Sequence, residues 1–189
     1  MTNQLQNDLY QVLLESELPE PVDAQDATVF ISNYIEEIEP MPVGKAAEQI
    51  LIALDEEGAI AVTTSIKIPN LKFKLGALLL ETVSSGVAFS GTAKDPIKLL
   101  LVGIRFLQKV RQLATIEIAS REAELLLAIY RLIHDKQVPT VDRLIEVIGD
   151  RLSEAQIAKS LEGLEKLSCI QLTMDRIVLN ETIVIRREK

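Results

Sequence analysis

Histidine and cysteine, two residues that often carry acid–base and nucleophilic catalysis, each occur once in this 189-residue chain. His134 is the only histidine, and Cys169 is the only cysteine. A Ser–His–Asp or Cys–His site would need His134, and the sequence places no nucleophile near it. His134 stands near the end of a predicted helix, where the helix dipole favours a cation, and Cys169 fits a small core residue.

Other chemical motifs are also incomplete. The segment "SSGVAFSGT" (84–92) has two glycines but lacks the lysine and the spacing of a phosphate-binding loop. "DEEG" (55–58) fits a helix end better than a metal site, and no pair of carboxylates stands out for acid–base work. A single cysteine excludes an internal disulfide framework and a multi-cysteine metal site. The sequence therefore predicts a non-enzymatic protein without a cofactor or metal; an enzyme of unknown class ranks third, after two binding functions.

The composition is that of a folded chain, with 48% hydrophobic and 25% charged residues. Only 4% of residues are aromatic and there is no Trp, so the predicted core is aliphatic. The start "MTNQLQNDLY" lacks the basic and apolar regions of a signal peptide. The longest apolar run, 75–88, is interrupted by Glu81 and two serines, which argues against membrane insertion. We expect a cytoplasmic protein.

The net charge of −8 is concentrated towards the N-terminus. Nothing before Lys45 is cationic, whereas nine residues in that stretch are acidic. A phosphate backbone would repel this stretch, so any nucleic-acid contact must come from the C-terminal part.

Residues 1–114 are predicted to form a mainly helical acidic domain with a short β element. Apolar residues recur at helical spacing in 3–15, 27–39 and 46–57. The β-branched stretch 59–68 predicts a strand, and 71–75 is either a second hairpin strand or the start of the next helix.

Two apolar helices are expected to follow. Residues 75–89 are apolar nearly all round, which predicts a buried core helix or, alternatively, an interface or membrane-surface helix. Asp95 as N-cap and Pro96 at the first helical position predict a helix over 96–113. Its cations flank an apolar stripe, which indicates a solvated face or, alternatively, a membrane or acidic-partner surface.

The C-terminal segment, 115–189, is predicted to be a second domain with a more regular pattern. A short strand (115–119) leads to three helices, with Ser120, Thr140 and Ser153 as their N-caps. A hairpin follows, with 170–172 paired against 177–179 and with Met174 and Asp175 at the turn.

This order of helix, short helix, longer helix and hairpin resembles the winged helix-turn-helix family over about residues 115–180. The predicted fold class is therefore mainly α with minor β, in which a helical N-terminal part precedes a C-terminal winged helix-turn-helix. The resemblance implies that residues 153–167 are the recognition helix and that 174–176 are the tip of the wing.

Seven polar side chains are candidates for contacts with a nucleic acid or a protein partner. They are Gln156, Lys159, Ser160, Lys166, Arg176, Arg186 and Arg187. The first four are expected on the exposed face of the predicted recognition helix. The predicted recognition helix contains no Arg, the residue that most often contacts bases, and its glutamates would flank the phosphates. A protein-facing winged helix is therefore favoured, and a DNA-binding transcriptional regulator is the alternative.

These observations together predict an adaptor or regulatory protein that acts through protein–protein interaction. The partner is either another protein or a second copy of the chain. The segments 75–89 and 96–113 carry more apolar surface than a small domain easily covers. The last apolar segment, "TIVIRR" (182–187), could form an edge strand or pair with another chain.

Overall fold

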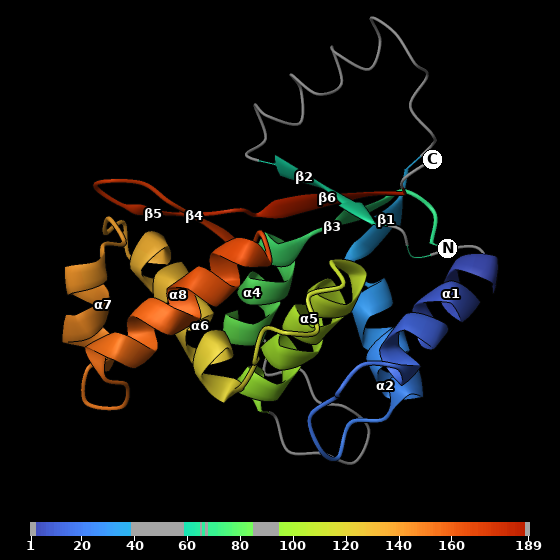
Figure 1. Ribbon diagram of the computed structural model, residues 1–189, viewed down its shortest axis with the longest axis horizontal. Helices are drawn as coiled ribbons and strands as arrows, with labels where there is room; N and C mark the ends of the chain where they lie inside the picture. The colour runs from blue at the N-terminus through green and yellow to red at the C-terminus, as the bar shows by residue number, and fades with distance from the viewer. Residues whose placement is uncertain (1–2, 39–58, 65, 67, 85–94, 188–189) are drawn as a thin grey trace, which may run out of the picture.

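The computed structural model describes residues 3–38, 59–64, 66, 68–84 and 95–187 of the chain. Within them the protein is mainly helical, with seven helices and two small sheets (Figure 1). The helices are α1 (Asn3–Leu14), α2 (Ala24–Ser32), α4 (Leu75–Ser84), α5 (Pro96–Val110), α6 (Ser120–His134), α7 (Val141–Ile148) and α8 (Glu154–Lys166). The strands are β1 (Ile35–Glu37), β2 (Ala59–Thr64), β3 (Leu71–Phe73), β4 (Ile170–Leu172), β5 (Ile177–Leu179) and β6 (Thr182–Arg187). The helix predicted over 46–57 and the end of the one predicted over 75–89 lie outside the described residues.

A four-stranded sheet contains strands from both ends of the chain, in the order β1–β3–β6–β2. β6 lies inside this sheet, antiparallel to β3 and parallel to β2. The expectation that "TIVIRR" forms an edge strand or pairs with another chain is therefore wrong. Its central residues Ile183, Val184 and Ile185 are fully buried, as is usual for an interior strand.

Helices α4 and α5 pack beneath this sheet, and α5 is the central helix of the molecule (Figure 1). The predicted N-cap Asp95 accepts hydrogen bonds from the backbone N–H groups of Ile97 and Lys98. Every residue of α5 from Leu99 to Ile104 is buried, because α1, α2, α4 and α6 all contact this helix. The expectation of uncovered apolar surface on α5 is therefore wrong.

Helix α4 buries one face and exposes the other. Leu75, Leu78 and Leu79 are fully buried, whereas Leu80 and Val83 are 52% and 41% exposed. The prediction of a helix that is buried all round therefore holds for only one of its faces.

Two of the three N-caps predicted in the C-terminal segment are confirmed. Thr140 accepts from the N–H of Arg143, and Ser153 accepts from the N–H of Gln156. Ser120 is instead the first residue of α6, and Ala119 occupies the N-cap position. Ala119 has no side-chain acceptor, so only one half of a capping box exists there: a Glu122 carboxylate oxygen accepts from the Ala119 N–H at 2.7 Å.

The extended segments of the N-terminal part differ most from the sequence-based expectation. Residues 35–37 form β1 rather than the end of a helix, since α2 stops at Ser32 and β1 pairs with β3. The stretch 71–75 serves both of its predicted roles, because β3 ends at Phe73 and α4 begins at Leu75. Residues 115–119 form a turn, a bend and an irregular segment, and not the predicted strand.

The C-terminal segment contains α6, α7, α8 and the antiparallel hairpin β4–β5, in the predicted order. Ile170 pairs with Leu179 and Leu172 with Ile177, which is the predicted register. The backbone N–H of Ile177 also donates to the Pro139 carbonyl oxygen at 2.7 Å, so the loop before α7 contacts β5.

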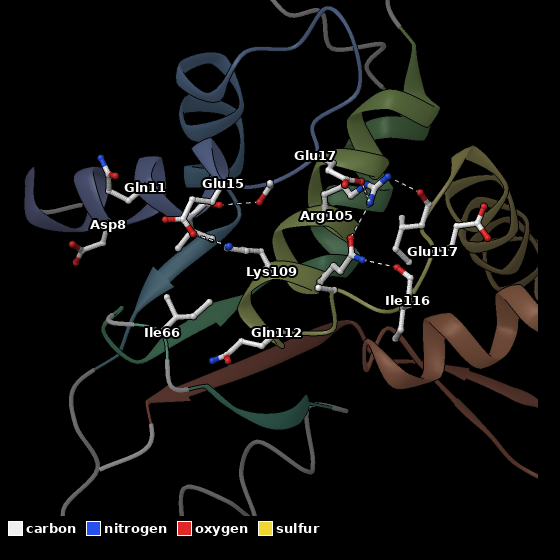
Figure 2. A pocket seen from close by; sticks show the side chains of 15 residues that line it. Asp8, Gln11, Glu15, Glu17, Ile66, Arg105, Lys109, Gln112, Ile116 and Glu117 are labelled. Carbon is white, nitrogen blue, oxygen red and sulfur yellow. Dashed lines mark hydrogen bonds and ion pairs between the residues drawn. The ribbon is translucent and has the colours of Figure 1, made fainter.

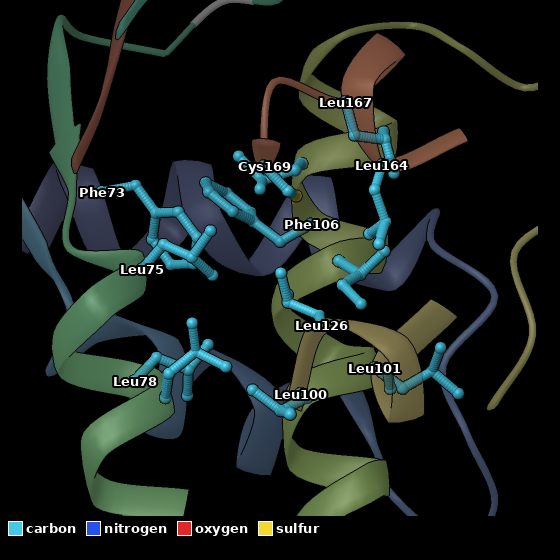
Figure 3. Close-up of a cluster of buried hydrophobic side chains, with 14 of the residues drawn as sticks. Phe73, Leu75, Leu78, Leu100, Leu101, Phe106, Leu126, Leu164, Leu167 and Cys169 are labelled. Carbon is cyan, nitrogen blue, oxygen red and sulfur yellow. The ribbon is translucent and has the colours of Figure 1, made fainter. Parts of the chain in front are cut away.

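One cluster of buried side chains extends from the N-terminal part into the C-terminal segment. Figure 3 shows Phe73 and Leu75 at the end of β3 and the start of α4, with Phe106 of α5, and Leu126 and Leu164 farther along the chain. A continuous core and the interior position of β6 therefore link residues on both sides of position 114. The division into domains 1–114 and 115–189 stays a prediction.

Candidate partner-binding surface

Helix α8 and the β4–β5 turn contain five of the seven candidate contact residues. The helix begins at its Ser153 cap and packs through Ile157, Leu161 and Leu164, which are buried. A carboxylate oxygen of Glu165 accepts from the N–H of Leu172 at 2.9 Å, and this bond fixes the hairpin against the helix. The elements therefore hold the outer face of α8 and the hairpin turn in a defined arrangement.

Gln156 takes part in the N-terminal cap of α8. Its side-chain oxygen accepts from the Ser153 N–H at 2.9 Å, and its own N–H donates to the Ser153 hydroxyl. Gln156 is exposed, but its side chain is already used in a capping box.

Lys159 is bound to an acidic residue from the segment before α6. Its ammonium group lies 3.1 Å from a Glu117 carboxylate oxygen, which also lies 3.4 Å from the Arg121 guanidinium. The hydrogen bond and the charge of Lys159, followed by the charge of Arg121, lower the pKa of Glu117. The charge of Lys159 is therefore offset within the protein.

Ser160 is fully buried, so the expectation that it lies on the exposed face of α8 is wrong. Its hydroxyl donates to a carboxylate oxygen of Glu122 at 2.7 Å, and the same oxygen accepts from Arg121 Nε at 3.0 Å. Glu122 is only 2% exposed, and it lies in the first turn of α6, which packs against α8. Ser160 therefore fixes the contact between two helices and is unavailable to a partner.

Lys166 pairs with Glu162 one turn earlier on the helix, and this contact lowers the pKa of Glu162. At the same end of α8, Arg111 donates to the Lys166 carbonyl oxygen at 3.1 Å. The outer face of α8 carries three carboxylates, those of Glu154, Glu162 and Glu165, against the two lysines. Its formal charge is therefore slightly negative.

The hairpin turn is the most exposed part of this surface. Thr173 closes it, since its N–H donates to the Arg176 carbonyl oxygen at 3.0 Å. Arg176 is exposed, Met174 is fully exposed, and Leu172 is 39% exposed. The turn therefore presents one cation, Arg176, and one acid, Asp175, beside two apolar side chains.

Arg186 and Arg187 are not part of this surface. Both belong to the C-terminal end of β6, where they are in register with Thr63 and Thr64 of β2. In Figure 1 this end of β6 and the β4–β5 hairpin lie at opposite sides of the view. The structure thus brings α8 and the hairpin turn together and does not bring Arg186 and Arg187 to them.

Sequence reasoning missed a second feature, a groove between α1, α5 and the segment 114–118. Its volume is about 810 Å³, and its lining includes Glu15, Glu17, Arg105, Gln108 and Lys109 (Figure 2). The i, i+4 spacing of Arg105 and Lys109 was visible in the sequence, but the acids that meet them come from the distant segment that follows α1.

Neither His134 nor Cys169, the two residues considered for catalysis, lies in surroundings that would activate it. His134 is exposed, with its Nδ1 atom 3.5 Å from an Asp135 carboxylate oxygen. Cys169 is buried, and burial raises the pKa of its thiol to about 12, which suppresses the nucleophilic thiolate. Within the described ranges, no group of three or more His, Cys, Asp or Glu side chains is arranged to hold a metal ion.

No helix in the described part of the chain is both long enough and apolar enough to cross a membrane. Comparisons of the chain with protein-family models, with curated proteins and with solved structures find no match.

Proposed function

We propose that this chain is a non-enzymatic adaptor or regulator whose C-terminal segment is a winged helix that binds a protein partner. The binding surface consists of the outer face of α8 and the β4–β5 turn, and it is called the α8–turn surface below. The partner is another protein or a second copy of this chain.

The observation that carries this proposal is the charge of the outer face of α8. Three carboxylates stand against two lysines, and each lysine is already paired with a glutamate of the same chain. Binding to a duplex would require breaking these pairs and bringing the carboxylates close to the phosphates, which costs electrostatic free energy. A mixed-charge surface of this kind suits a protein partner better.

The hairpin turn supports the same reading. Met174 and Leu172 are exposed apolar side chains beside Arg176, and Met and Arg are enriched at protein interfaces. A methionine at an exposed turn can adapt its shape to a partner's surface. The turn would therefore supply apolar contact area next to the charged helix face.

The alternative, a DNA-binding regulator, is tested by titrating a labelled random-sequence duplex of about 20 base pairs with the purified chain. Fluorescence anisotropy is measured at several salt concentrations. We expect no salt-dependent binding. Lys159 and Lys166 are paired with glutamates, so Arg176 is the one cation of the α8–turn surface that forms no ion pair with another described residue. Binding that weakens steeply with salt, and that Arg176→Ala reduces while Arg143→Ala on α7 does not, would overturn the proposal in favour of DNA.

A further inference from the structure

The groove between α1 and α5 holds two cations that are one helical turn apart. Arg105 and Lys109 occupy positions i and i+4 of α5, so their Cβ atoms are separated by about 6 Å. Lys109 Nζ lies 2.6 Å from a Glu15 carboxylate oxygen, and Arg105 Nη1 lies 3.2 Å from one of Glu17 (Figure 2). Both acids follow the end of α1, two residues apart.

The cations and the acids differ in how firmly the structure holds them. The side chains of Arg105 and Lys109 are 15% and 33% exposed, whereas those of Glu15 and Glu17 are 64% and 86% exposed. Ion pairs with such exposed partners contribute little to stability, because solvent screens them and the long side chain loses freedom. Glu15 and Glu17 can therefore swing out of the groove at small cost.

The floor of the groove is a fixed network around Arg105. Its Nη2 donates to the Ile118 carbonyl oxygen at 2.6 Å, and its Nη1 also donates to the Gln108 side-chain oxygen at 3.0 Å. Gln108 is held in turn by the Ile116 carbonyl oxygen, at 2.6 Å from its Nε2. The Nε atom of Arg105 is buried and has no hydrogen-bond partner among the described residues. The guanidinium is thus held in place, and its Nε–H group lacks a hydrogen-bond acceptor among the described residues.

The other acids of the groove already have partners. Asp8 accepts a hydrogen bond of 2.8 Å from Gln4, and Glu117 is paired with Lys159 and Arg121. Glu15 and Glu17 are thus the two groove acids that pair with Lys109 and Arg105, and a ligand that brings two carboxylates can replace these exposed side chains. The volume of about 810 Å³ lies within the range of small-molecule pockets.

We propose that this groove binds a small dicarboxylate, whose two carboxylates replace those of Glu15 and Glu17 on Lys109 and Arg105. A planar guanidinium and an ammonium one turn apart match two carboxylates separated by a short carbon chain. Glu15 and Glu17 then compete with the dicarboxylate for the two cations. The apparent affinity for the dicarboxylate falls with the fraction of time that the two glutamates occupy these cations. The inference is independent of the α8–turn surface.

The test is isothermal titration calorimetry of the full chain with glutarate at constant ionic strength. Butyrate serves as the monocarboxylate comparator and putrescine as the dication comparator. The double variant Glu15→Gln/Glu17→Gln removes the competitors, Lys109→Met removes one cation, and Lys98→Met on the same helix is the matched control outside the groove. Arg105 is left unchanged, because it is largely buried and its substitution could disturb the fold. Circular dichroism verifies that each variant is folded.

We expect saturable glutarate binding that becomes roughly three- to tenfold tighter in the double variant, as the loss of two weak competing pairs implies. Lys109→Met should abolish this binding, and Lys98→Met should leave it unchanged. The proposal is overturned if glutarate does not bind the double variant, if both lysine variants weaken binding equally, or if putrescine binds more tightly than glutarate.

Discussion

The hydroxyl of Ser160 in α8 donates a 2.7 Å hydrogen bond to the buried carboxylate of Glu122 in α6. The other oxygen of this carboxylate accepts from the Ala119 N–H and so completes the start of α6. One acidic side chain thereby joins a helix cap to a helix–helix contact. Because both partners are buried, this pair should affect stability more than it affects partner binding.

We predict that Ser160→Ala lowers the free energy of unfolding by about 1 kcal/mol, since Glu122 keeps its bonds to Arg121 and Ala119. Glu122→Ala should cost about 3 kcal/mol, because it removes the cap and leaves the Ser160 hydroxyl without its partner. Urea denaturation of both single variants and the double variant gives the coupling energy. Strictly additive effects would show that the two side chains do not interact.

The glycines of α5 and α8 should respond in opposite ways to substitution by alanine. At Gly163 of α8 an added Cβ would lie 3.6 Å from Ile116 Cγ2, an ordinary contact, so the higher helix propensity of Ala should raise stability by about 0.5–1 kcal/mol. At Gly103 of α5 the Cβ would lie 2.6 Å from Leu78 Cδ2, and Leu78 is fully buried. Overpacking in Gly103→Ala should lower the free energy of unfolding by about 1–3 kcal/mol, and the higher helix propensity of Ala would offset part of this loss. Thermal denaturation measures both changes, and a destabilised Gly163→Ala variant would contradict the packing of α8 described above.

Cys169 should make stability depend on pH in the alkaline range. Burial raises the pKa of its thiol from 9.0 to about 12, so above pH 9 the unfolded chain releases a proton that the folded chain retains. The stabilisation that comes from burying the neutral thiol is fully present below pH 9 and is lost as the pH rises from 9 towards 12. Between pH 8 and 10 the wild type should lose about 1 kcal/mol more stability than Cys169→Ala. Equal losses in the two proteins, measured by urea denaturation at each pH, would show that the thiol is not buried as described.

The interior position of β6 predicts that its side chains matter for the N-terminal sheet. Ile185 is fully buried and is in register with Leu71 of β3 and Val62 of β2, so Ile185→Ala should cost about 2–4 kcal/mol. Val138, 59% exposed in the loop before α7, is the matched control, and Val138→Ala should change stability by less than about 0.5 kcal/mol. Hydrogen exchange should show faster exchange in β2 and β3 of the Ile185→Ala protein. Faster exchange confined to the C-terminal segment would contradict the observed strand order.

The sequence predicted the features that depend on neighbouring residues. Asp95, Thr140 and Ser153 were identified as caps because a cap needs only its own side chain and the next N–H groups. The β4–β5 hairpin was likewise visible from its alternating pattern and its short turn. These local signals account for most of the C-terminal segment.

The features that the sequence missed depend on distant partners. Residues 35–37 form a strand because β3 lies beside them, and "TIVIRR" is interior because β2 and β3 meet it from far along the chain. Ser160 looked exposed because helical spacing does not reveal that a buried Glu122 faces it. The groove escaped detection for the same reason, since Glu15 and Lys109 meet only in the folded chain.

The most direct test of the α8–turn surface is a comparison of partner recovery by three forms of the tagged chain from its native host. The first is the wild type, the second carries Ala155→Glu, Ala158→Glu and Met174→Asp on that surface, and the third carries Val29→Asp on the distant helix α2. All substituted positions are exposed, so each form should fold. Quantitative mass spectrometry, with light scattering to detect self-association, should find a protein or second copy bound by the wild type and the Val29→Asp form but lost from the triple variant. Equal recovery of every partner by all three forms, or a monomer that recovers none, would contradict the proposal.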